Sequence, residues 1–362
     1  MRRPAVTEVL VVCGVGGAGK TTSSVVLALA HAASGKRVAL LTIDPARRLA
    51  DAIGLAHLGN APVRVPVDLR GSVDALMLDR RAAWEELVRA QAPDGEIAER
   101  LLANSYFRAV SERLSGGHEY MANEKLHQLA TSGRWDLVVV DTPPSRHALD
   151  FLRASDRIQR LLDERLLGAL LRPSTGIVGL ATRGIADAVR RLAGDAMLQD
   201  LRDFFELVAG LADGLRARAE AVSRLVRSPA CRFVLTLSAR APQTEEVKSF
   251  LSTLGDEHIR FEGFVINRWI APSDAAADDA SPPAPAGVTA EVWADALTRL
   301  RLARRERIER GAADAALAAD LLRYHRGGVW KIPDSPVGTA DLAGLAELAR
   351  SLEPAYAGAP LP

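Results

Sequence analysis

The amino-acid sequence predicts an α/β fold, in which a mostly parallel, doubly wound sheet has helices on both faces and carries an inserted layer of further helices. Short apolar runs bounded by turn signals recur along the chain, and they are continuous rather than alternating, which is typical of strands buried on both faces of a parallel sheet. Between the first two runs, residues 21–34 read as a helix that Gly35 ends, which completes a β-α-β unit. The predicted strands cover residues 9–13, 38–43, 137–140, 233–237 and 264–266, with weaker strands at 75–78 and 329–332.

Two long stretches, residues 80–131 and 151–228, lack strand patterns and carry apolar residues at helical spacing. We expect them to be insertions that form a helical subdomain on a single domain of residues 1–362. Residues 271–288 are rich in Ala, Asp, Pro and Ser, and this composition predicts a flexible loop. The apolar content of the second insertion leaves two interpretations open, namely a helical layer packed on itself or an apolar groove for a client or subunit partner.

The composition argues against several classes of protein. Lys and Arg number 46 against 45 Asp and Glu, so no overall field attracts the chain to nucleic acid or anionic lipid. The two cysteines, Cys13 and Cys231, lie in separate apolar runs and can form neither a zinc clamp nor a site for a soft metalloid. Even the apolar residues 161–180 contain four charges, so no stretch suits a membrane span. We expect a cytoplasmic protein that is not an integral membrane protein, binds no nucleic acid and holds no zinc.

Residues 14–21 follow the pattern Gly, any four residues, Gly-Lys-Thr, directly after a predicted strand and at the start of a predicted helix. This is the context of a phosphate-binding P-loop, in which glycines let successive backbone N–H groups approach the phosphate oxygens. Lys20 is predicted to contact the β- and γ-phosphates and to serve catalysis, the Thr21 hydroxyl to bind Mg²⁺, and Thr22 to meet the α-phosphate. The predicted loop comprises Gly16, Gly17, Ala18, Gly19, Lys20, Thr21 and Thr22, with ATP and Mg²⁺ as the cofactors.

The same glycines also fit the dinucleotide fingerprint Gly-x-Gly-x-x-Gly, with Asp44 placed as a ribose-binding carboxylate. Two features disfavour that interpretation. Lys20 and Thr21 follow the last glycine directly, as a P-loop requires and the fingerprint does not. A second carboxylate, Asp141, also ends a predicted strand, where a Walker B aspartate holds a Mg²⁺-bound water.

Asp44 ends the second predicted strand, which is expected beside the P-loop strand, at the edge where open α/β sheets bind ligands. A carboxylate there can orient or deprotonate the water that attacks the γ-phosphate, so Asp44 is the predicted catalytic residue. Together with Thr21 and Asp141, it forms the predicted set of oxygen groups around Mg²⁺. The alternative is a turn or helix-capping aspartate fixed by Pro45.

Together these motifs resemble the arsenite-pump and tail-anchored-protein-targeting ATPases, which are dimeric P-loop ATPases with a deviant Walker loop. The resemblance rests on residues 16–22, on residues 42–51 as the family's first switch, and on residues 141–149 as its second switch. It implies that Asp44 activates water and that Asp141 is an outer-sphere Mg²⁺ carboxylate.

The resemblance implies further roles. Pro144 and His147 would be switch residues that couple the nucleotide state to the helical layer, with a purely local partner as the alternative for His147. Asn267, at the end of a later strand, matches the family's adenine contact. Pro333 and Asp334 resemble the loop that flanks the adenine.

One position departs from the family. The family's loop has the pattern Lys-Gly-Gly-x-Gly-Lys-Thr, in which the first lysine reaches the partner's phosphates across a dimer, and that position is Val15 here. The missing charge has two candidate sources: a nearby arginine of this chain, or a paralogous subunit. The candidate arginines are Arg47, Arg48 and Arg146.

The sequence therefore predicts a Mg²⁺-dependent ATP hydrolase that acts as a nucleotide-driven conformational switch in a dimer and handles apolar client or membrane-protein segments. The alternative is a low-turnover regulatory subunit that needs a paralogous partner to complete its site. The sequence therefore leaves open whether the dimer is a homodimer or a heterodimer. An arsenite function is disfavoured because it needs clustered thiolates. With four methionines and no cysteine clamp, tail-anchor targeting is weakened as well.

Overall fold

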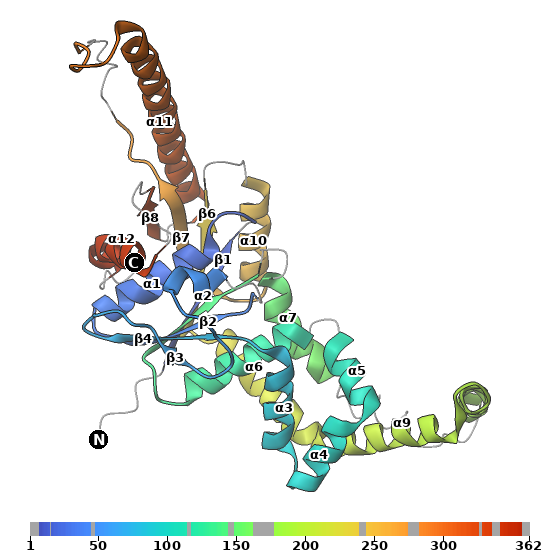
Figure 1. Ribbon diagram of the computed structural model, residues 1–362. Coiled ribbons are helices and arrows are strands. Elements are labelled where there is room, and N and C mark those ends of the chain that lie inside the picture. Colours follow the sequence, from blue (N-terminus) through green and yellow to red (C-terminus); the bar gives the residue numbers. More distant parts are fainter. Residues whose placement is uncertain are drawn as a thin grey trace.

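A computed structural model describes the chain over residues 7–14, 16–44, 48–113, 117–143, 148–161, 177–238, 244–273, 282–325, 328–334 and 341–356. An eight-stranded sheet forms its centre, with the strand order β3-β4-β2-β5-β1-β6-β7-β8 (Figure 1). Every neighbouring pair is parallel except β3 with β4. The strands are β1 Glu8–Gly14, β2 Arg37–Thr42, β3 Val63–Arg64, β4 Ser72–Met77, β5 Leu137–Asp141, β6 Cys231–Leu237, β7 Arg260–Trp269 and β8 Gly328–Pro333.

The predicted α/β class and the mostly parallel sheet are confirmed, and one neighbour relationship is wrong. The strand that precedes Asp44, β2, does not lie beside the P-loop strand β1, because β5 is inserted between them. All five residues of β5 are buried, so its continuous apolar run suits the middle of the sheet. The insertion places Asp141 between the ends of β1 and β2.

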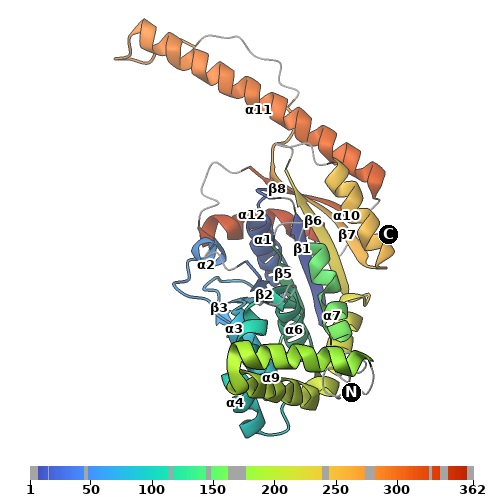
Figure 2. The same cartoon turned by 90° about the vertical axis from the view of Figure 1, so that its right-hand side faces the viewer.

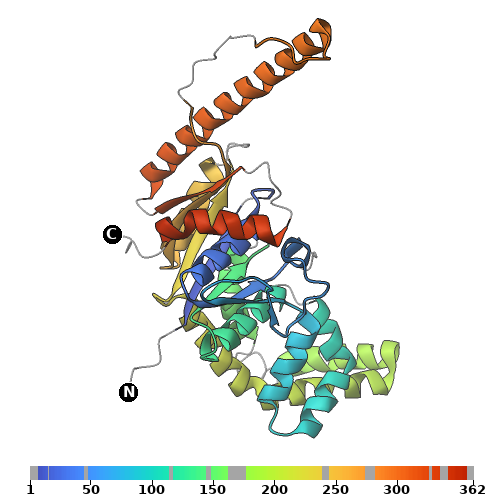
Figure 3. The ribbon, with the colours of Figure 1, turned by 60° about the vertical axis from the view of Figure 1, so that its left-hand side comes forward.

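Alternate residues of the strands supply two separate cores. From β1, Leu10 and Val12 face the core formed with helices α1 (Lys20–Ala33) and α12 (Leu342–Tyr356). Val9 and Val11 face the opposite core, formed with α6 (Gly117–Thr131), α7 (Ala148–Leu161) and part of α9 (Ile177–Val226). Figure 3 shows α1 and α12 side by side on one face of the sheet. The sheet is thus covered on both faces, as the continuous apolar strands predict.

Helices fill the two stretches that lack strand patterns. The first contains α3 (Arg80–Gln91), α4 (Gly95–Ala103), α5 (Ser105–Arg113) and α6, and the second contains α7 and the long α9. Arg218 of α9 pairs with the buried Glu124 of α6 at 2.7 Å. Because an unpaired buried carboxylate is strongly unfavourable, this pair helps to fix α9 on α6. No helix in the described ranges is long and apolar enough to cross a membrane.

The longest helix that the sequence patterns missed is α11 (Ala290–Tyr324), which follows residues 271–288 of the predicted loop. It projects from the end of the molecule opposite α3, α4 and α5 (Figures 1 and 2). Its C-terminal part is anchored to the sheet, where the buried Asp314 accepts a hydrogen bond from the backbone N–H of Ile270. The shorter helices α2 (Arg48–Ile53) and α10 (Thr244–Asp256) complete the fold. Residues 274–281 of the predicted loop lie outside the described ranges.

Candidate nucleotide site

The loop between β1 and α1 has a backbone that demands glycine. Gly17 and Gly19 have φ angles of 80° and 84°, in the left-handed region that side chains disfavour. Gly14 has another reason to be glycine, because a Cβ there would lie 2.6 Å from the carbonyl oxygen of Thr236 on β6. In contrast, a Cβ on Gly16 or Gly17 would meet no atom of the described residues within 4 Å. The loop therefore leaves open space beside the residues predicted to approach phosphate.

The N-terminus of α1 has features that favour the binding of an anion. Its N-cap is Gly19, which offers no side-chain cap, and its first turn contains no acidic residue. The first N–H groups and the positive end of the helix dipole are thus left for a ligand. Burial lowers the pKa of Lys20, while the nearby carboxylate of Asp141 opposes this shift. Thr22 is half-buried on the same turn.

Asp141 accepts hydrogen bonds from three hydroxyl groups. Thr21 Oγ1 donates to its Oδ2 at 2.8 Å, Ser24 Oγ donates to Oδ1 at 3.2 Å, and Thr42 Oγ1 donates to Oδ2 at 3.2 Å. Asp141 is fully buried, and burial raises its pKa to about 6, although the three hydroxyls pull the pKa down. A buried carboxylate fixed in this way has a defined orientation directly beside the predicted Mg²⁺ ligand Thr21.

Asp44 lies just beyond β2, and its side chain is about a quarter exposed. Its Oδ2 is 3.6 Å from Nη1 of Arg48, the first residue of α2. Arg48 is 74 % exposed, so its guanidinium can move without unpacking the fold. Both side chains act electrostatically on Lys20, which places this pair near the phosphate loop.

Asn267 reaches the phosphate loop from β7. Its side-chain amide donates to the carbonyl oxygen of Ala18 at 3.0 Å, and the residue is 5 % exposed. Pro333 ends β8, the neighbouring strand, and Asp334 follows it with its backbone N–H donating to the carbonyl of Trp269. The side chain of Asp334 pairs with Arg310 of α11 at 3.1 Å. The three residues predicted around the adenine thus lie at or just beyond the ends of two adjacent strands, β7 and β8.

Some predicted residues lie outside the described ranges. They are Val15 in the loop, the switch residues Pro144 and His147, and two of the three arginines considered as substitutes for the missing lysine, Arg47 and Arg146. Arg48 is the candidate arginine whose position the structure gives.

The residues present suit a triphosphate and a hydrated Mg²⁺ ion. In the described ranges, no group of three or more His, Cys, Asp or Glu side chains could enclose a metal. Mg²⁺ does not need such a cage, because it retains waters and takes phosphate oxygens with only one or two protein groups. Thr21 and Asp141, which are joined by a hydrogen bond, supply two such protein groups.

Comparison with known proteins settles the family. The model of the anion-transporting ATPases matches residues 7–277. The chain belongs to this family. The resemblance drawn from the loop and the switches is thereby confirmed, and with it the expectation of an ATP hydrolase.

Several proteins of known sequence are similar to this chain. ATPase get3 of Aspergillus terreus is 25% identical over 268 residues, 74% of each chain. ATPase GET3 of Malassezia globosa is 26% identical over 187 residues, and the match covers 50% of this chain and about half, 54%, of that protein. The Streptomyces coelicolor protein SCO2128 is 28% identical over 353 residues, 93% of this chain and 75% of that protein.

The sequence patterns missed two residues of the site. Ser24 and Thr42 both donate to Asp141, yet neither belongs to the Gly-Lys-Thr pattern. A signal was present, since Ser24 lies one helical turn after Lys20, and Thr42 lies near the end of the predicted strand 38–43, two residues before Asp44. Only the position of β5 next to β2 shows that Thr42 meets Asp141, because the two residues are paired in register.

Proposed function

We propose that the chain is a Mg²⁺-dependent ATPase that works as a nucleotide-driven conformational switch in a dimer. The observation that carries the proposal is the hydrogen bond from Thr21 to the buried Asp141, beneath a helix N-terminus that has no cap of its own. In P-loop enzymes, this pair of groups holds Mg²⁺ and its water while the loop amides hold the phosphates.

The roles of the chain's own residues follow from these positions. Lys20 neutralises charge on the β- and γ-phosphates. The Thr21 hydroxyl would hold a bound Mg²⁺ ion, which would supply further positive charge to the phosphates. Asp141 orients the hydration shell and holds the Thr21 hydroxyl in place. Asp44 orients the attacking water and accepts its proton.

Arg48 is the candidate for the second cation that Val15 fails to supply. An exposed ion pair such as Arg48 with Asp44 contributes only about 0–1 kcal/mol, so the charge of a bound triphosphate can compete for Arg48. We infer that Arg48 leaves Asp44 when ATP binds, which adds positive charge at the γ-phosphate and removes the guanidinium from beside the Asp44 carboxylate. This arrangement favours a chain that completes its own site over one that needs a paralogous subunit.

A route from the phosphate site to the helical layer exists at the end of β2. His118 of α6 lies with Nε2 3.0 Å from the carbonyl oxygen of Ile43, the residue before Asp44. The backbone N–H of Leu78, two residues before α3, donates to the carbonyl of Thr42 at 3.0 Å. A movement of Asp44 would therefore displace the ends of α3 and α6 through these hydrogen bonds. The helical layer would then bind or release a client according to the nucleotide state.

The proposed dimer has a suitable surface on α11. Six arginines and two glutamates lie between residues 299 and 310, whereas Glu291 and Asp295 precede them. Leu300, near the start of the basic region, is 61% exposed. A second copy packed antiparallel about Leu300 would set the acidic end of each helix against the basic middle of the other.

ATP turnover tests this function directly. Lys20→Ala should abolish ATP binding, and Asp44→Asn should bind ATP without hydrolysing it, as measured by calorimetry with a non-hydrolysable analogue and by phosphate release. Normal hydrolysis by Asp44→Asn would contradict the catalytic assignment. A wild-type chain that binds ATP but turns over only with a paralogue would favour the alternative of a regulatory subunit.

A further inference from the structure

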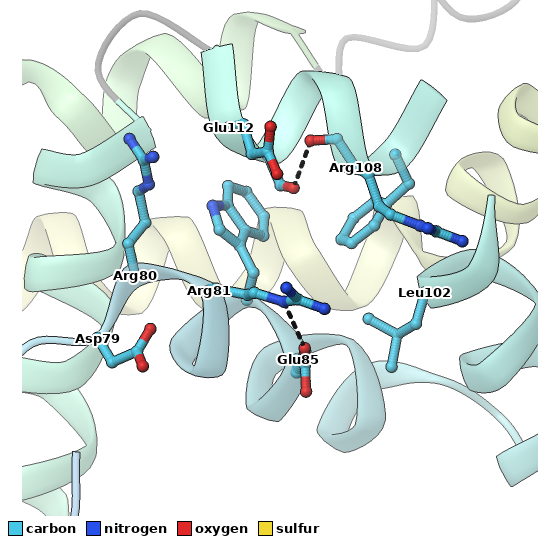
Figure 4. Close-up of a pocket in the computed structure, with 10 residues that line it drawn as sticks. Asp79, Arg80, Arg81, Glu85, Leu102, Arg108 and Glu112 are labelled. Carbon is cyan, nitrogen blue, oxygen red and sulfur yellow. Dashed lines mark hydrogen bonds and ion pairs between the residues drawn. The ribbon is translucent and has the colours of Figure 1, made fainter. Parts of the chain in front are cut away.

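A cavity of about 720 Å³ lies in the helical layer, apart from the nucleotide site. Side chains of α3, α4 and α5 line it together with Asp79, which precedes α3, and six of the ten lining residues are charged (Figure 4). Its volume lies in the range of small-molecule sites. The charged lining does not suit a long apolar client, so a smaller polar molecule is the more fitting occupant.

One residue of the cavity lining, Trp84, carries a buried hydrogen-bond donor without an acceptor among the described residues. Trp84 of α3 is only 9% exposed and packs edge-to-face on Phe107 of α5, with ring centroids 6.1 Å apart. Its indole Nε1 has no hydrogen-bond partner among the residues that the structure describes. Buried donors are normally paired with protein or with a ligand, so this N–H is open to an acceptor from within the cavity. Phe107 and Leu102 add apolar surface to the same wall.

Most charges of the lining are already engaged. Arg81 pairs with Glu85 at 3.2 Å, and Figure 4 shows the two side chains facing each other. Asp79 caps α3 by accepting from the backbone N–H of Ala82, and Arg108 donates to the carbonyl of Ala103.

Arg80 differs from these residues. It is half-buried, and it makes no hydrogen bond or ion pair with any other residue that the structure describes. Arg80 and Trp84 are one helical turn apart, so they share a face of α3. The guanidinium and the indole N–H are thus two donors available to one acceptor group. Glu112 also lacks a partner in the described ranges, but it is exposed.

We propose that this cavity binds a small organic monocarboxylate with an apolar body. The carboxylate accepts from Arg80 and from the Trp84 indole, because a guanidinium matches the two oxygens of a carboxylate. The apolar body packs on Phe107 and Leu102. The three arginines and three acidic residues of the lining cancel in formal charge, so the cavity offers no excess charge for a nucleotide or another multivalent anion. The site does not depend on the proposed ATPase mechanism.

The full-length chain can be titrated by calorimetry with sodium 4-phenylbutyrate as the probe and with 4-phenylbutyramide as its uncharged control. We expect the carboxylate to bind and the amide to bind at least about tenfold more weakly. Arg80→Gln should weaken 4-phenylbutyrate about tenfold, and Trp84→Phe, which keeps the ring but loses the N–H, should weaken it about three- to tenfold.

Arg81→Gln is the matched control, because Arg81 neighbours Arg80 but is paired with Glu85, and its affinity should stay within about twofold of the wild type. Glu112→Gln should bind 4-phenylbutyrate about as tightly as the wild type or more tightly, since it removes a like charge.

Circular dichroism of each variant checks folding, and the result for Trp84→Phe decides the test if Arg80→Gln does not fold. Absence of 4-phenylbutyrate binding to the wild type at millimolar concentration overturns the proposal. Equal binding by the wild type and the folded Arg80 or Trp84 variants overturns it as well.

Discussion

The side-chain amide of Asn267 donates a hydrogen bond to the carbonyl oxygen of Ala18, 3.0 Å away, and so joins the end of β7 to the phosphate loop. The contact is close enough that a Cβ on Gly19 would lie 2.0 Å from the Asn267 amide nitrogen. The strand predicted to reach the adenine and the loop predicted to hold the phosphates therefore pack on each other. Each can fix the position of the other.

Gly19→Ala should disturb this junction. Alanine at a φ of 84° costs about 1–2 kcal/mol, and the clash with Asn267 adds to this, so urea denaturation should show a loss of about 2–4 kcal/mol. Gly16→Ala is the control, because its added Cβ meets nothing within 4 Å. Equal stability of the two variants would mean that the Gly19 contact does not constrain the loop.

Thr42→Val should destabilise the protein by about 1–3 kcal/mol, because it removes a donor from the buried carboxylate of Asp141. It should also weaken Mg²⁺-dependent nucleotide binding. Thr236→Val, on β6 of the same sheet, is a matched control. The Thr236 hydroxyl is buried without a hydrogen-bond partner among the described residues, so its loss should be neutral or stabilising. Chemical denaturation of both variants measures the difference. A larger loss for Thr236→Val would refute the assignment.

Arg48→Ala should lower kcat for ATP hydrolysis by about tenfold to a hundredfold, while ADP affinity changes little, because ADP lacks the γ-phosphate. Arg48→Lys should restore part of kcat, as expected for a charge contact. Steady-state kinetics and calorimetry with ADP separate the two effects. If Arg48→Ala hydrolyses ATP like the wild type, the second cation lies elsewhere. A wild-type chain without ATPase activity would instead refute the proposed function itself.

His31 should make the fold sensitive to acid. Burial, helped by the charges of Lys36 and Arg232, lowers the pKa of this histidine from 6.5 to about 3. The folded chain therefore keeps His31 neutral, and its contribution to stability is full above pH 6.5 and is lost as the pH falls toward 3. His31→Gln should reduce the slope of unfolding free energy between pH 6.5 and 5 by up to about 1.4 kcal/mol per pH unit. His57→Gln, at an exposed site, is the control.

If that slope is unchanged in His31→Gln, the acid sensitivity arises from other groups.

Leu300→Cys should form a disulfide-linked dimer under mild oxidation, because an antiparallel pair of α11 helices brings the two copies of residue 300 together. Val292→Cys is equally exposed, at 61%, but lies far from that axis and should cross-link poorly. The native cysteines, Cys13 and Cys231, are buried and free, so they should not interfere. Non-reducing electrophoresis reads the result. Strong cross-linking at residue 292 would indicate parallel helices, and none at either site would rule out this interface.

Much of the fold could be predicted because it depends on local patterns. The continuous apolar runs gave the parallel strands, and Gly35 marked the end of α1. The α11 helix was missed because its apolar residues follow no single face, and six arginines surround them. The two-residue β3 is too short for a period to be visible.

The sequence by itself determined the family and the predicted positions of the phosphate-binding groups. The spacing from Gly14 to Thr21 and the acidic residues that follow two apolar runs specify a P-loop and its carboxylates, because backbone angles and strand ends are local properties. Only the tertiary structure decided which groups meet. The insertion of β5 between β1 and β2 aligns Asp141 with Thr42 and places it beside Thr21, and no spacing along the chain encodes that order. Strand order is set by burial of the most apolar strand at the centre, which is a property of the whole sheet.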